Sequence, residues 1–157
     1  MSLFVKIPQD AVLLSRDDAS HPLAAYSKHD FQLDEAHWPS VEHYFQAMKF
    51  SDSRLQEKIR QAPHPKIAAR IARNHFWKIR RDWKKIRRVV MTRATYIKCR
   101  SHEDVAQALL ATGERTIVEQ SLYDHYWGCG RDQRGHNYFG KMLMAVRDRL
   151  REEGAAV

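Results

Sequence analysis

Apolar residues recur at intervals of three and four along most of this 157-residue chain, which is the spacing of one buried face of an α-helix. Prolines, glycines and capping residues divide the pattern into segments of ordinary helix length. The pattern predicts six helices, at residues 40–50, 52–62, 66–74, 83–98, 101–112 and 138–152.

Shorter apolar runs fall between the helices, mostly near the N-terminus. Residues 3–7 and 11–15 predict two strands or one interrupted strand, residues 31–38 a hairpin, and residues 116–119 a further short strand. The predicted fold class is therefore α+β and mainly helical. We expect a single domain over residues 1–157, with about six helices and a few short N-terminal strands.

Polar residues that can cap a helix precede most of these segments. A capping side chain accepts a hydrogen bond from a backbone N–H group of the first turn, which has no partner inside the helix. The expected signals are Ser40, then Ser51 or Asp52, then Pro65 as a first helical residue, then Asp82, and finally Ser101 with Asp104 as a variant capping box.

The first predicted helix combines a buried stripe with a distinctive polar face. Glu42, Gln46 and Lys49 fall at positions i, i+4 and i+7, so they share that face. An acid, an amide and a cation on one rigid element could hold a polar substrate. Equally, they could form a solvated face on which the helix dipole favours an acid in the first turn. The residues of this helix expected to be buried are Val41, Tyr44, Phe45 and Met48.

Composition narrows the class of protein. A hydrophobic fraction of 43% is typical of a globular domain, and no apolar run approaches the roughly 18 residues of a membrane span. The N-terminus does not resemble a signal peptide, so we expect a cytoplasmic protein. Cys99 and Cys129 predict reduced thiols, and the nine histidines are too scattered to predict a metal site or a cofactor.

The net charge of +8 is concentrated in one segment. Residues 66–100 contain thirteen lysines and arginines against one acidic residue, Asp82, a net of +12 that leaves about −4 for the rest of the chain. Such a cluster can bind nucleic acid or a phosphorylated small molecule. A charged helix face exposed to water is the commoner meaning of such a run.

Two blocks of sequence point to a family. The first is Trp-Pro-Ser-Val-Glu-His-Tyr-Phe-Gln-Ala-Met-Lys-Phe at residues 38–50. The second joins Asp-His-Tyr-Trp-Gly-Cys-Gly at residues 124–130 to Gly-His-Asn-Tyr-Phe-Gly-Lys-Met-Leu-Met-Ala-Val-Arg at residues 135–147. In sequence, order and distance they resemble the motifs of the NADAR family of YbiA-like N-glycosidases. The similarity covers about residues 20–152.

The resemblance implies a hydrolase that cleaves a C–N glycosidic bond. The substrate would be a phosphoribosyl or ADP-ribosyl compound, such as an early riboflavin-biosynthesis intermediate or ADP-ribosylated guanine. Cleavage passes through a transition state with oxocarbenium character, which calls for negative charge near the sugar and a group that activates water. Glu42 and Asp124, the carboxylates inside the two blocks, are the predicted catalytic residues. The predicted substrate-binding residues are Tyr44, Gln46, Lys49, Trp83, Trp127, Gly128, Arg134 and Asn137.

Several of these residues have a structural alternative. Trp83 could stack on a base or pack in the core, and Asp124 could cap its own loop. Arg134 and Asn137 precede a helix whose N-terminus favours anions, which suggests a phosphate site. The glycines around them match no known phosphate-loop fingerprint, and tight turns explain them equally well. Residues 120–137 form a long connection of the kind that is more often functional than idle.

The chain departs from the family pattern at Leu23-Ala24-Ala25-Tyr26, where a Leu-Ser-Asn-Phe-like stretch is expected. Either the substrate differs or a neighbour such as Ser27 replaces the missing polar groups. Two other functions therefore stay open. One is a non-catalytic ADP-ribose or nucleotide reader, and the other is a nucleic-acid-binding domain that uses residues 66–100.

Overall fold

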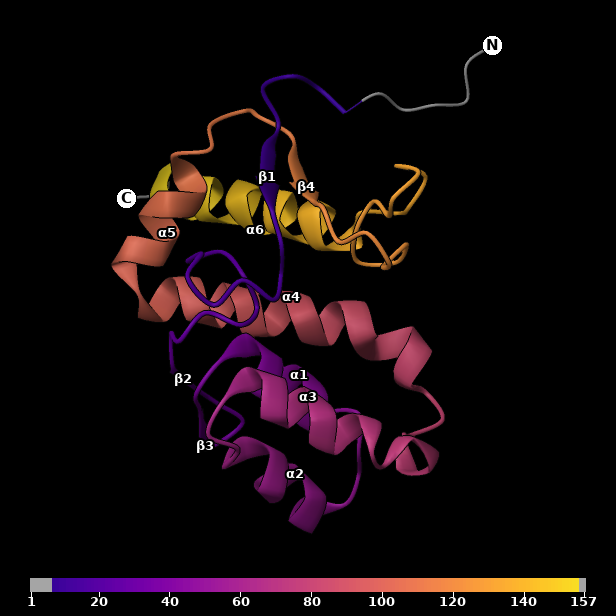
Figure 1. The fold of residues 1–157 in the computed structure, drawn as a ribbon. Helices are drawn as coiled ribbons and strands as arrows, with labels where there is room; N and C mark the ends of the chain where they lie inside the picture. The colour runs from indigo at the N-terminus through magenta and orange to yellow at the C-terminus, as the bar shows by residue number, and fades with distance from the viewer. Residues whose placement is uncertain (1–6, 156–157) are drawn as a thin grey trace. The chain divides into compact units, whose positions relative to one another are not determined.

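The computed structural model describes residues 7–155 and folds into two compact units (Figure 1). One unit is residues 25–102, and the other combines the chain up to residue 24 with the chain from residue 103 onward. The described residues contain six α-helices and four short strands, which confirms the predicted, mainly helical α+β class. The strand expected at residues 3–7 lies almost wholly outside the described residues. The single domain over residues 1–157 stays a prediction.

The unit of residues 25–102 is a hairpin followed by helices. Strands β2 and β3 pair antiparallel, with Phe31 opposite Trp38, around a turn in which Asp34 and Glu35 both have positive φ. Helix α1 packs against β3, α2, α3 and α4. The bounds are β2 Phe31–Leu33, β3 Ala36–Trp38, α1 Val41–Ala47, α2 Ser53–Arg60, α3 Pro65–Arg73, the 3-10 helix η1 Phe76–Lys78 and α4 Trp83–Ser101.

Every residue of α1 is buried. Ser40 caps the helix as predicted, because its hydroxyl oxygen accepts a hydrogen bond from the His43 N–H at 3.2 Å. The alternative of a solvated polar face is wrong for Glu42 and Gln46, which are 1% and 7% exposed. Neighbouring elements surround this short helix, so it has no side left for water. Met48, expected to be buried, follows the last helical residue and is half-buried.

Two other helix starts agree with the predicted signals. Asp52 caps α2 by accepting from the Arg54 and Leu55 N–H groups, and Pro65 is the first residue of α3.

At α4 and α5 the prediction needs correction. Asp82 precedes α4 but makes no side-chain cap, because the Arg80 guanidinium binds its carboxylate at 2.6 and 3.1 Å. The capping box at Ser101 is wrong. Ser101 is the last residue of α4, its hydroxyl donates back to the Ile97 carbonyl at 2.8 Å, and α5 begins only at Glu103.

The second unit is built on a parallel strand pair. Strand β1 (Val12–Leu14) pairs with β4 (Ile117–Glu119), which places Val12 opposite Ile117. Helix α6 (Tyr138–Ala155) packs against β4 and against α5 (Glu103–Leu110), and β1 and β4 lie side by side in Figure 1. The buried Arg147 of α6 donates to the Thr112 hydroxyl and to the Arg115 carbonyl, which fastens the turn after α5 to α6.

The surroundings of His43 predict that the stability of the unit of residues 25–102 depends on pH. Its Nδ1 lies 2.7 Å from the Ser40 hydroxyl and its Nε2 lies 2.9 Å from the Ala62 carbonyl. This pairing fits the neutral ring, in which Nε2–H donates to Ala62 and Nδ1 accepts from Ser40. Burial lowers the pKa of His43, outweighing the opposing effect of the hydrogen bond to Ala62. The unfolded chain takes up this proton near the ordinary pKa of about 6.5, whereas the folded protein resists it.

We therefore expect stability contributed by neutral His43 to be complete above about pH 6.5 and to be lost as the pH falls through the lower folded pKa. In urea unfolding at pH 7.5 and pH 5.5, the midpoint of the wild type should drop more than that of His43→Gln. Equal drops in the two proteins would show that His43 does not carry this dependence.

Candidate active site

Glu42 lies in the first turn of α1 with its side chain inside the protein. Its backbone N–H donates to the Ala25 carbonyl at 3.1 Å, so the helix start is fastened to the segment that precedes the hairpin. Its Oε1 accepts a hydrogen bond of 2.6 Å from the Gln46 side-chain amide, one turn further along. The polar face predicted from spacing is thus a buried pair of an acid and an amide.

The amide oxygen of Gln46 is the notable atom of this pair. It is buried and accepts no hydrogen bond from the described residues. Buried polar atoms in native proteins nearly always have a partner, and an exception calls for an explanation such as a ligand or an ordered water. The Glu42–Gln46 pair is therefore a candidate binding site.

Tyr44 belongs to a network that sequence reasoning missed. Its hydroxyl donates to Asp34 at 2.6 Å, and Arg93 binds the same carboxylate at 2.8 Å. Burial, followed by the hydrogen bond to Asp34, raises the pKa of Tyr44 well above its ordinary value. Its ring packs edge-on against Trp38 at a centroid distance of 5.1 Å. Tyr44 thus anchors the hairpin, and Asp34 could not be found from spacing because it lies in the turn.

Trp83 and Lys49 both lie against Phe45. The Trp83 ring is tilted against the Phe45 ring at a centroid distance of 5.0 Å, and Trp83 is only 7% exposed. The Lys49 ammonium lies 5.5 Å from the centroid of the Phe45 ring, within the range of a cation–π interaction. This geometry favours core packing for Trp83, while a role in binding substrate stays a prediction.

Asp124, the other predicted catalytic residue, holds its own loop in shape. Its Oδ1 accepts from the N–H groups of Tyr126 and Trp127 at 2.9 and 2.8 Å, and its Oδ2 accepts from Arg16 at 3.2 Å. Asp124 therefore caps its own loop, which is the structural alternative to a catalytic role. It places the buried Trp127 ring edge-on to Tyr126, at a centroid distance of 4.8 Å.

A second carboxylate in this unit escaped prediction. Glu119, at the end of β4, is fully buried and accepts hydrogen bonds from the Arg16 N–H and from the N–H and hydroxyl of Ser121. Arg16 thus links Glu119 and Asp124. Because 103 residues separate Arg16 from Glu119 in the chain, no local pattern could have found the pair.

Asn137 joins the end of the loop to β4. Its side-chain oxygen accepts from the Glu119 N–H at 2.8 Å and its amide donates to the Ile117 carbonyl at 2.9 Å. These bonds occupy the amide group predicted to bind substrate. A Cβ at Gly140 would lie 2.1 Å from the Ile117 carbonyl, so this glycine permits the close approach of α6 to the strand.

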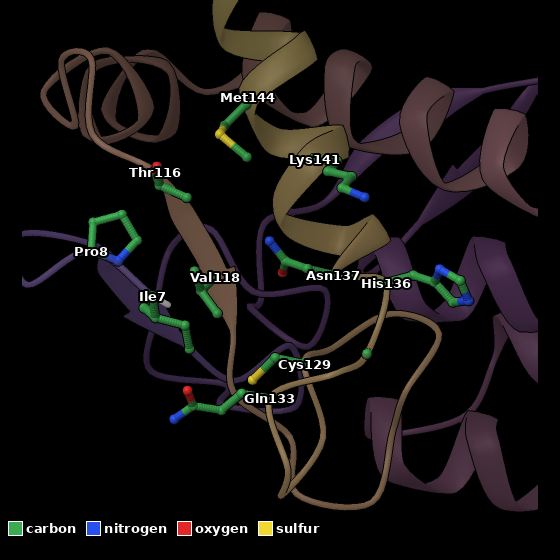
Figure 2. A pocket seen from close by; sticks show the side chains of 11 residues that line it. Ile7, Pro8, Thr116, Val118, Cys129, Gln133, His136, Asn137, Lys141 and Met144 are labelled. Atoms are coloured by element: carbon green, nitrogen blue, oxygen red, sulfur yellow. The ribbon is translucent and has the colours of Figure 1, made fainter. Parts of the chain in front are cut away.

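The other predicted residues of the loop differ in exposure. Gly128 is buried, and a Cβ there would lie 3.0 Å from the Glu119 carboxylate, whereas Arg134 is exposed. A cavity of about 240 Å³ lies beside the loop, lined by Val118 of β4, by Cys129, His136 and Asn137, and by Lys141 and Met144 of α6 (Figure 2).

The structure thus gathers the predicted residues in two groups. Tyr44, Gln46, Lys49 and Trp83 belong to the same unit as Glu42, and of these four Gln46 bonds to the Glu42 carboxylate. In the other unit, Trp127, Gly128 and Asn137 lie in the loop held by Asp124, with Arg134 on its surface.

Three general features of residues 7–155 complete the description. Cys99 and Cys129 are free and buried, and burial raises the pKa of Cys99 to about 11. Within this range no group of three or more His, Cys, Asp or Glu side chains is placed to hold a metal ion. Of the helices in this range, none has the length and apolar character needed to cross a membrane.

Comparison with known proteins gives a consistent result. A family model described as the NADAR domain matches residues 3–151. The chain is 37% identical over 129 residues to an N-glycosidase of Nostoc punctiforme, covering 80% of this chain and 83% of that protein. It is 34% identical over 146 residues to N-glycosidase YbiA of Escherichia coli, covering 92% and 91% of the two chains.

A longer relative and a solved structure add to this. The chain is 44% identical over 115 residues to a riboflavin biosynthesis protein of Vibrio vulnificus, covering 73% of this chain but 31% of that protein. The NMR structure of the Escherichia coli protein YbiA superposes with a TM-score of 0.82 at 31% identity, covering 96% of this chain and 92% of that one.

Trp83→Ala should lower the free energy of unfolding by about 3–5 kcal/mol, the usual cost of removing a large buried aromatic ring. Trp77→Ala is the matched control, because Trp77 is 65% exposed and its loss should change stability by no more than about 0.5 kcal/mol. Chemical denaturation of both variants measures the difference. If Trp83→Ala lowered the free energy of unfolding by less than 1 kcal/mol, the Trp83 ring would not be part of the core.

Proposed function

Since the chain belongs to the NADAR family, we propose that it hydrolyses the N-glycosidic bond of a ribose-containing small molecule, with Glu42 as the carboxylate that acts on the bond. The protein is a hydrolase. Relatives named N-glycosidase match it at 34–37% identity over most of its length.

The observation that carries the assignment of Glu42 is its buried pairing with Gln46. As an N-glycosidic bond breaks, positive charge builds on the sugar ring, and a carboxylate in a site without water stabilises that charge far better than one in solvent. The hydrogen bond from Gln46 fixes the carboxyl group before the substrate arrives. The unpartnered amide oxygen of Gln46 is an acceptor for a sugar hydroxyl or for the attacking water.

Asp124 takes a different role in this proposal. Both of its oxygens are committed, one to two N–H groups of its own loop and the other to Arg16. A carboxylate bound in this way shapes a loop better than it exchanges a proton. We therefore assign the chemical step to Glu42, and to Asp124 the shaping of the loop that contains Trp127 and Gly128.

Within the class of ribose-containing small molecules, we propose a phosphoribosyl or ADP-ribosyl compound as the substrate. The Lys49 side chain, two residues beyond the end of the helix that carries Glu42, supplies a cation suited to a phosphate group. Ala24 and Ala25 are fully buried, and the Ala25 carbonyl accepts from the Glu42 N–H. The departure from the family pattern thus contacts the backbone of the proposed catalytic residue. A substrate that differs from that of the relatives, or a reader that binds ADP-ribose without cleaving it, would leave its mark at this position.

Glu42→Gln should lower turnover by about 10²–10⁴-fold, the usual contribution of a positioned acid or base, while the fold survives. The substitution keeps the volume of the side chain and an acceptor for Gln46. The assay is mass-spectrometric detection of the released base, with a panel of ADP-ribosylated guanosine and early phosphoribosyl-pyrimidine intermediates of riboflavin synthesis.

Glu103→Gln is the matched control. Glu103 also lies in the first turn of a helix and accepts at 2.8 Å from a glutamine one turn later, Gln107, but it is exposed. Its turnover should equal that of the wild type. Full turnover by a folded Glu42→Gln protein would remove Glu42 from the mechanism, and tight ADP-ribose binding by a wild type that cleaves nothing would identify the reader.

A further inference from the structure

Two aromatic side chains stand in water in the middle of the basic segment. Phe76 and Trp77, on the short helix η1 between α3 and α4, are 68% and 65% exposed. The chain has four tryptophans, and the other three are 4–7% exposed. Neighbouring exposed rings of this size suggest a surface that contacts a partner.

Hydrogen bonds on either side of η1 hold the backbone that carries these rings. The His75 ring, 5.7 Å from the Trp77 ring, donates to the Ile71 carbonyl at 2.8 Å, and the Arg80 N–H donates to the Lys49 carbonyl at 2.8 Å. Phe76 and Trp77 meet edge to face, at 88° and a centroid distance of 5.6 Å. A segment whose backbone is held in this way loses little backbone entropy when a partner binds to its rings.

Cations surround the aromatic pair on both sides along the chain. Lys66, Arg70 and Arg73 share one face of α3 at positions i, i+4 and i+7, and that face ends three residues before Phe76. The one acidic side chain in residues 66–100, Asp82, is bound by Arg80. Lys98, by contrast, is buried and adds nothing to this surface. The exposed cations from α3 to the first turns of α4 are Lys66, Arg70, Arg73, Lys78, Arg81, Lys84, Lys85 and Arg88.

We propose that η1, with the adjoining ends of α3 and α4, binds single-stranded nucleic acid. Cations that follow a phosphate backbone, together with rings on which bases stack, are the shared features of proteins that bind single strands without sequence preference. A solvated helix face accounts for the cations but not for the exposed rings. A membrane-surface element needs an apolar helix face, whereas η1 has only three residues. The proposal does not depend on hydrolysis by Glu42.

The test is fluorescence anisotropy with labelled single strands of twelve deoxythymidines or twelve uridines, in 50 and 200 mM salt. We expect binding of at least one strand that weakens as salt rises. The variant Phe76→Ala/Trp77→Ala should lose about 5- to 100-fold in affinity. Tyr123→Ala, which removes a ring that is 86% exposed in the other unit, should bind as the wild type does.

Charge and stacking can be tested separately. Arg73→Ala/Lys84→Ala/Arg88→Ala should flatten the plot of log affinity against log salt by about two units, whereas Lys58→Ala, an exposed lysine outside the segment, should not change the slope. Trp77→Phe should keep most of the affinity but lose the quenching of tryptophan fluorescence by the unlabelled strand. Preference for one sugar would identify the nucleic acid.

Three results would overturn the proposal. They are no binding of either strand at 50 mM salt, equal affinity of the wild type and the Phe76→Ala/Trp77→Ala variant, and binding to anionic phosphatidylserine vesicles without binding to either strand. Circular dichroism of each variant checks the fold, which exposed positions should leave unchanged.

Discussion

Helix α1 constrains the unit of residues 25–102 because it has no exposed side. A helix surrounded by protein must satisfy its polar side chains internally, since a buried polar group without a partner costs about 1–3 kcal/mol. His43 does so through Ser40 and the Ala62 carbonyl, and Tyr44 through Asp34 in the hairpin turn. The bonds to Ala62 and Asp34 also connect α1 to the segment after α2 and to the hairpin turn. The Gln46 amide oxygen is the exception, because it is buried and accepts no hydrogen bond from the described residues. It is therefore the strongest indication of function in this helix.

A buried carboxylate organises the other unit in a comparable way. Glu119 gathers Arg16 and Ser121, and Arg16 extends the cluster to Asp124, whose own bonds shape the loop around Trp127. Asn137 completes the arrangement by bonding the far end of that loop to β4. The long connection at residues 120–137 contains no helix or strand, and these side chains hold it together with backbone hydrogen bonds inside the loop, such as that from the Asn137 N–H to the Gly128 carbonyl.

Local signals were enough to predict the helices of this fold, and long-range contacts were not. Periodicity and caps placed α2 at Asp52 and α3 at Pro65 because those features act within one turn of a helix. The parallel pairing of β1 with β4 and the bond between Arg16 and Glu119 join segments about a hundred residues apart, and nothing in either segment alone encodes its partner. The capping box at Ser101 failed because α4 continued through it, which a local motif cannot register.

Burial decides how strongly the same pair of residues can interact with a ligand. Glu42 with Gln46 and Glu103 with Gln107 are pairs of the same residue types with the same spacing, and each glutamate lies in the first turn of its helix. Glu103 is exposed, where water and salt screen its charge and the pair is worth little. Glu42 is buried, and water screens its charge much less, so its electrostatic interaction with a ligand bound at the Gln46 amide is stronger. Periodicity alone cannot separate the two cases, because the difference lies in the elements packed around each helix. The family resemblance separated them, because Glu42 lies inside one of the two motif blocks and Glu103 lies outside both.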